Sequence, residues 1–115
     1  MSSIDILRRI AMKLLEDPMV LDVKFLRTKV RAILMGEFVL DIYYNAATGR
    51  YSFTLLRGSR RLMTWDNAPH HITIPTFPHH FHDVDGRIKP SDLSGDPFID
   101  IRKVLTKIRH FIGQA

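Results

Sequence analysis

The sequence contains no cysteine. Disulfides, thiol redox chemistry, cysteine-ligated zinc and iron–sulfur clusters are therefore excluded. It also lacks the roughly 20 consecutive apolar residues of a membrane-spanning helix, and its first residues lack the basic and apolar blocks of a secretory signal. These absences predict a soluble, cytoplasmic protein. The length of 115 residues and the hydrophobic share of 45% predict one domain over residues 1–115, since domains run from about 50 to 250 residues.

Positive charge exceeds negative charge, and the excess is concentrated in one part of the chain. The formal net charge is +5. Between Val23 and Arg61 there are eight Lys and Arg residues and only two acidic ones. Such clustering is typical of a protein that binds a polyanion, nucleic acid first. The alternative is a solvated surface whose charge only keeps a small protein soluble.

Helices are predicted at both ends of the chain. Ser2 and Asp5 are spaced as a capping box in front of apolar residues at helical spacing, and Pro18 predicts an end by about Asp17. Asp96 and Gly113 have the residue types that begin and follow a second helix. Each of these helices has one apolar face for a core.

The region between the helices has the alternating pattern of β-strands. Five segments are rich in β-branched and aromatic residues: Val20–Leu26, Val30–Met35, Phe38–Tyr44, Tyr51–Leu56 and Arg60–Asp66. Short connections make neighbouring strands antiparallel. The predicted fold class is α+β: an N-terminal helix, an antiparallel meander of about five strands, an extended His/Pro-rich segment and a C-terminal helix. Residues 83–96 are predicted to be an ordinary connection.

Turn chemistry predicts the register of the last two hairpins. The loop after Tyr44 pairs Tyr44 with Tyr51, and the two-residue turn at Gly58-Ser59 pairs Leu55 with Leu62. A regular ladder then places Leu62 in the core and Trp65 on the opposite face. That opposite face is predicted to hold Val39, Asp41, Tyr43, Ser52, Thr54, Leu56, Arg61, Met63 and Trp65.

Histidine is concentrated just after the last predicted strand. Five of the six histidines are His70, His71, His79, His80 and His82. Three prolines nearby fix the backbone φ angle, so the segment is expected to be extended. Alternate side chains of an extended chain share a side. The imidazoles of His80 and His82 should therefore point together, with His79 on the other side.

Three interpretations of this segment remain open. Imidazoles titrate near pH 6.5, so two of them can serve as general base and general acid, with a nearby arginine stabilising a phosphorane. Neutral imidazoles can instead bind a metal ion, with Asp66 joining them, although the spacing is not that of a helical zinc motif. Finally, the histidines can hydrogen-bond loop carbonyls while Asp66 and Asn67 form the turn.

Two blocks of this segment carry a resemblance to a known family. Residues 66–71 read Asp-Asn-Ala-Pro-His-His, and residues 76–80 read Thr-Phe-Pro-His-His before His82. This pattern resembles the signature of the TumE family of small prokaryotic toxins, and the similarity extends roughly from Glu37 to His82. The resemblance implies a toxin that is neutralised by a cognate antitoxin protein.

The sequence therefore predicts a toxin that cleaves RNA by histidine acid–base chemistry, without a cofactor or a bound metal. The predicted catalytic residues are His70, His71, His79, His80, His82 and Asp66. The predicted RNA-binding residues are Arg57, Arg60, Arg61, Asn67, Tyr43 and Trp65. The expected partners are the antitoxin and RNA, with a homodimer left open and no membrane. The alternatives are a non-enzymatic toxin that blocks a cellular target and a metal-dependent hydrolase of nucleotides or nucleic acid.

Overall fold

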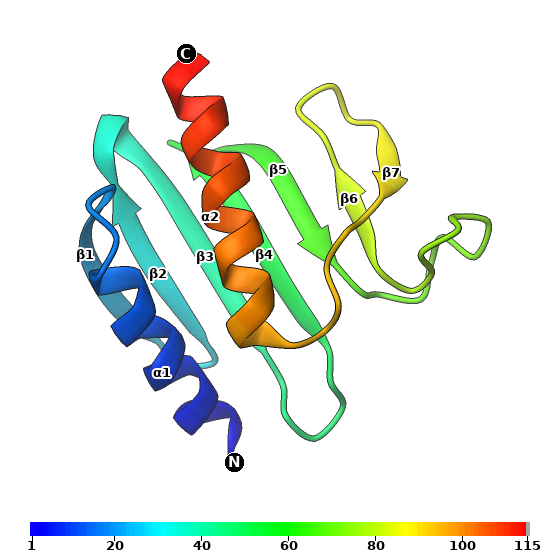
Figure 1. The fold of residues 1–115 in the computed structure, drawn as a ribbon, viewed down its shortest axis with the longest axis horizontal. Helices are drawn as coiled ribbons and strands as arrows, with labels where there is room; N and C mark the ends of the chain where they lie inside the picture. Colours follow the sequence, from blue (N-terminus) through cyan, green and yellow to red (C-terminus); the bar gives the residue numbers. More distant parts are fainter. Residues whose placement is uncertain (115) are drawn as a thin grey trace.

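The strands form one antiparallel sheet in which each strand pairs with the next in sequence, as the computed structural model of residues 1–114 shows (Figure 1). The strands are β1 (Val20–Leu26), β2 (Lys29–Leu34), β3 (Phe38–Tyr44), β4 (Tyr51–Arg57), β5 (Arg60–Asp66), β6 (His80–His82) and β7 (Ile88–Pro90). The helices are α1 (Ser3–Leu15) and α2 (Pro97–Gln114), with a short 3-10 turn at Met35–Glu37. The predicted α+β class is confirmed. The short strands β6 and β7 were missed, because three residues are too few to show an alternating pattern.

Both helices begin where the sequence predicts. In α1 the Oγ atom of Ser2 accepts a hydrogen bond from the Asp5 backbone N–H at 3.1 Å, and the Asp5 carboxylate accepts one from the Ser2 N–H at 3.4 Å. At α2 the Asp96 carboxylate accepts a hydrogen bond from the Phe98 N–H at 3.0 Å. Each cap satisfies backbone donors that a helix start leaves unpaired. Within residues 1–114, no helix is long and apolar enough to cross a membrane.

The two helices cover the same face of the sheet (Figure 1). The core lies between them and the strands, where Leu7, Ile10 and Leu14 of α1 and Ile101, Val104 and Ile108 of α2 are buried. The opposite face, from which Asp41, Tyr43, Ser52 and Thr54 project, is not covered by either helix. We call it the open face.

An extra residue in β5 changes the predicted register. Leu56 pairs with Arg61 but Leu55 pairs with Met63, so Leu62 is a β-bulge. The predicted pairing of Leu55 with Leu62 was therefore wrong, whereas the predicted pairing of Tyr44 with Tyr51 is confirmed. One additional residue moves every later side chain of a strand to the other face.

Beyond the bulge, Met63 and Trp65 point into the core, and Thr64 and Asp66 lie on the open face. Trp65 is only 2% exposed and packs against Phe81 of β6 with ring centroids 4.9 Å apart. The prediction that Trp65 lies on the open face and stacks on RNA bases was wrong for this reason. The Trp65–Phe81 contact instead attaches β6 to the core.

Replacing Trp65 with alanine tests this register. We expect Trp65→Ala to lower the free energy of unfolding by about 3–5 kcal/mol, because it removes a large buried side chain. Urea denaturation measures the change. The control is Arg61→Ala on the open face, expected to cost no more than about 0.5 kcal/mol. If both variants lost equally little, Trp65 would be exposed, as the regular register requires.

Candidate functional site

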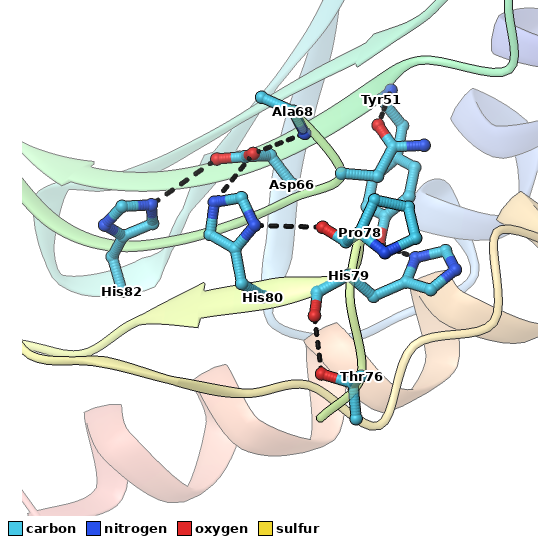
Figure 2. Close-up of polar contacts among 9 residues, drawn as sticks. Tyr51, Asp66, Ala68, Thr76, Pro78, His79, His80 and His82 are labelled. Carbon is cyan, nitrogen blue, oxygen red and sulfur yellow. Dashed lines mark hydrogen bonds and ion pairs between the residues drawn. The ribbon is translucent and has the colours of Figure 1, made fainter. Parts of the chain in front are cut away.

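Pairing of β5 with β6 brings a carboxylate and two imidazoles together on the open face. Asp66 lies opposite His80, and Thr64 lies opposite His82. Paired residues of antiparallel strands project on the same side of the sheet. The side chains of Asp66, His80 and His82 therefore point toward one another (Figure 2).

Asp66 is the centre of this arrangement. Its Oδ1 atom lies 3.0 Å from Nε2 of His80 and also accepts a hydrogen bond from the Ala68 backbone N–H at 2.9 Å. Its Oδ2 atom lies 3.6 Å from Nε2 of His82. One carboxylate thus orients both imidazoles and the chain that leaves β5.

His80 is held at both ring nitrogens. Its Nδ1 atom lies 3.0 Å from the Pro78 carbonyl oxygen, which can only accept a hydrogen bond, so Nδ1 carries a proton. Its Nε2 atom faces the Asp66 carboxylate, 3.0 Å from Oδ1. The side chain is 2% exposed. His80 is therefore fixed in orientation and shielded from solvent.

His71 completes the cluster from the loop between β5 and β6. Its ring centroid lies 4.6 Å from that of His80 and 5.8 Å from that of His82, and the last two rings are 4.9 Å apart. One nitrogen from each of the three rings lies within 4.8 Å of the others. We call His71, His80 and His82, with Asp66, the imidazole cluster. Its rings are close enough to exchange protons through a bound group or to hold one metal ion.

The environment of His82 changes its protonation. Partial burial lowers the pKa of its imidazole below the ordinary value of 6.5. The negative charge of Asp66 opposes this shift, because it stabilises the imidazolium form. Electrostatic interaction with the His80 and His71 imidazoles and with Arg61 lowers the pKa of His82 further. His82 is therefore predominantly neutral at pH 7.

Two of the predicted catalytic histidines lie outside the cluster. His79 points to the other side of β6, as predicted, where its Nδ1 atom lies 2.8 Å from the Tyr51 hydroxyl (Figure 2). Its ring stacks on that of Tyr51 with centroids 5.8 Å apart. Burial raises the pKa of Tyr51, which keeps the phenol protonated in this contact. His70 is exposed, with its ring 6.5 Å from that of His71.

Asn67 has a structural role in the site. Its Oδ1 atom accepts a hydrogen bond from the Tyr51 N–H at 2.9 Å, and its Nδ2 atom donates one to the Gly49 carbonyl at 2.9 Å. The side chain thereby ties the end of β5 to the start of β4. These two bonds occupy the amide that was predicted to bind RNA.

The three predicted arginines separate onto two faces. Arg61 pairs with Leu56 and lies on the open face. Arg57 and Arg60 pair with each other, and Arg57 also pairs with the buried Phe38, so both lie on the helix-covered side. The Arg57 guanidinium lies 4.7 Å above the Phe38 ring. Of these three arginines, Arg61 is the one on the face that carries the imidazole cluster.

A hollow of about 500 Å³ extends across the open face from Asp66. Its lining includes Tyr43, Arg50, Ser52, Arg61 and Thr64. A second hollow, lined by Arg61, Thr64 and His82, adjoins it. Both hollows therefore combine hydroxyl groups and arginine beside the cluster.

Thr64 is a functional candidate that the sequence reasoning missed. It is 6% exposed, and its Oγ1 atom is buried without a hydrogen-bond partner among residues 1–114. A buried hydroxyl without a partner is costly unless water or a ligand satisfies it. The regular register placed Thr64 opposite Phe53 in the core. The position of its unpaired hydroxyl on the open face therefore follows only from the bulge.

The comparison with protein families agrees with the two histidine blocks. The model of the family described as Toxin TumE matches residues 10–112. The chain belongs to the TumE toxin family. TumE membership makes it the toxin component of a toxin–antitoxin module, with a cognate antitoxin as partner. No curated protein and no solved structure matched the chain in the corresponding comparisons.

Replacing Asp66 with asparagine tests the electrostatics of this TumE site. Because Asp66 raises the pKa of His82, we expect Asp66→Asn to lower it further, so that the ring stays neutral to a lower pH. Titration of the imidazole signals by NMR measures the midpoint. Asp92→Asn, an exposed carboxylate elsewhere, is the control and should leave the midpoint unchanged. An unchanged midpoint in Asp66→Asn would contradict the Asp66–His82 interaction.

Proposed function

We propose that this toxin cleaves RNA on the open face of its sheet, with the imidazole cluster supplying the acid and the base. The observation that supports this most is the cluster itself, in which three rings lie together and two of them contact one carboxylate, beside a hollow lined with hydroxyls and arginine. Proton transfer by positioned imidazoles is a common solution for phosphodiester cleavage. The carboxylate–imidazole contact orients the rings as catalytic carboxylates do.

In this reaction the 2′-hydroxyl of RNA attacks the adjacent phosphorus. One imidazole takes the 2′-hydroxyl proton as the O2′–P bond forms. A second, protonated imidazole gives its proton to O5′ as the P–O5′ bond breaks. The products are a cyclic phosphate and a free 5′-hydroxyl, and no redox partner or metal is consumed.

The difference in burial among the three rings supports different proposed roles for them. His71 and His82 are partly exposed, whereas His80 is buried and held by Pro78 and Asp66. We therefore assign proton transfer to His71 and His82, and assign His80 and Asp66 to positioning. The neutral ring of a general base matches the environment of His82.

Arg61 and Thr64 are the proposed phosphate contacts. Both line the hollow that His82 shares, and Arg61 is close enough to influence the His82 ring electrostatically. A guanidinium stabilises the charge of a phosphorane, and a phosphate oxygen would accept the unpaired Thr64 hydroxyl proton. Tyr43, in the larger hollow, is placed to stack on an unpaired base.

Alanine variants of the exposed rings test the acid–base assignment. We expect His71→Ala and His82→Ala each to slow RNA cleavage by about 10²–10⁴-fold, the usual contribution of general acid–base catalysis. The assay measures cleavage of single-stranded RNA by pure protein in excess chelator. His70→Ala, one position from His71 and outside the cluster, is the matched control. Unchanged cleavage in both cluster variants would refute the assignment, and growth arrest without cleavage would favour a non-enzymatic toxin.

The two faces of the β4–β5 hairpin allow a matched test of RNA binding. We expect Arg61→Ala to weaken binding of single-stranded RNA and to reduce the slope of log affinity against log salt by about 0.7, the value for one phosphate contact. Arg60→Ala removes the same charge from the helix-covered side and should change neither. Fluorescence anisotropy at several salt concentrations measures both. Equal losses in the two variants would place RNA elsewhere than on the open face.

A further inference from the structure

We infer that His71, His80 and His82 form a binding site for one divalent transition-metal ion of the Zn²⁺ class. The candidate nitrogens of these three residues lie within 4.8 Å of one another. The residues come from a loop and from alternate positions of β6, so their convergence is a property of the fold. Three imidazoles with an open fourth position form a known donor set for zinc.

The distances suit a site that contracts slightly around the ion. Zinc binds imidazole nitrogen at about 2.0–2.1 Å, which places tetrahedral ligand nitrogens about 3.4 Å apart. Nitrogens separated by the full 4.8 Å must therefore approach by about 1.4 Å on binding. His71 and His82 are partly exposed and can make this adjustment, while the buried His80 remains fixed.

The surroundings of His80 are those of a metal ligand. Its Nδ1–H group donates to the Pro78 carbonyl, which leaves Nε2 as the ligand atom. Imidazoles that bind metals usually donate their other N–H to a carbonyl or carboxylate in this way, because the bond fixes the ring orientation.

Asp66 provides the negative charge that a dication requires. Its oxygens lie 3.0 Å and 3.6 Å from the Nε2 atoms of His80 and His82. Because Nε2 of His80 is the ligand atom, the carboxylate is placed to offset the charge of the ion or to contribute an oxygen ligand itself. Imidazole donors favour zinc, copper, nickel or iron over Mg²⁺ and Ca²⁺, which prefer oxygen ligands.

Metal binding and proton transfer require different states of the same rings. A ligand imidazole offers its lone pair to the ion, whereas a general acid must carry a proton on that nitrogen. The metal site does not depend on the proposed RNA cleavage, but the two cannot operate at the same rings at once. We therefore expect added Zn²⁺, without chelator, to slow RNA cleavage that does not itself require a metal ion.

Competition with a chromophoric chelator tests the site, with Zn²⁺ as the probe and the full chain as the protein. We expect one equivalent of Zn²⁺ to bind and to raise the thermal unfolding midpoint, since a ligand of the native state stabilises it. His71→Ala and His82→Ala should each weaken binding by about 100-fold or more, and Asp66→Asn by about 10–100-fold. Circular dichroism verifies that each variant is folded.

The matched control is His70→Ala, which removes a neighbouring imidazole outside the cluster and should leave the affinity unchanged. Equal Zn²⁺ affinity in wild type, His71→Ala and His82→Ala would overturn the site, as would the absence of binding to wild type. The cleavage assay separates this inference from the proposed function. RNA cleavage that requires Zn²⁺ and is lost in chelator would support the metal site and refute metal-free acid–base catalysis.

Discussion

The extra residue at Leu62 is the constraint on which the site depends. It turns Trp65 into the core and Asp66 onto the open face, and a regular strand would reverse both. The buried Trp65 contacts Phe81, which attaches the short strand β6 to the sheet. Core packing and site geometry are thus two consequences of one bulge, because the side chains of a strand alternate between its faces.

The two sides of β6 differ in the side chains that they present: aromatic packing on the core side and imidazoles on the open face. Phe81 and the stacked Tyr51–His79 pair anchor the strand and the loop before it from the core side. His80 and His82 project from the open side onto Asp66 (Figure 2). The contacts on the core side limit the movement of the imidazoles on the open face. Side chains held in a fixed position are effective in both catalysis and metal binding.

The residues of the His-rich segment have different surroundings despite its uniform composition. His79 supports Tyr51, Asn67 ties β5 to β4, and His70 is exposed at the edge. Fewer polar side chains line the hollows. Thr64 is one of them, and its buried hydroxyl has no hydrogen-bond partner in the described part of the chain. This division gives the proposed RNA-cleaving face a definite location, next to Arg61 and away from Arg57 and Arg60.

The local sequence determined both helices, their N-terminal caps, the five long strands, the β3–β4 register and the family. Gly113, which was predicted to follow the second helix, lies within α2. These features depend on residues close together in the chain, such as the Ser2–Asp5 box. The bulge at Leu62, the pairing of β6 with β5 and the approach of His71 to His80 depended on tertiary structure. The bulge is favoured because it buries Met63 and Trp65 against core residues that are distant in the sequence. The imidazole of His71, which lies in a loop, approaches His80 only after the sheet has formed.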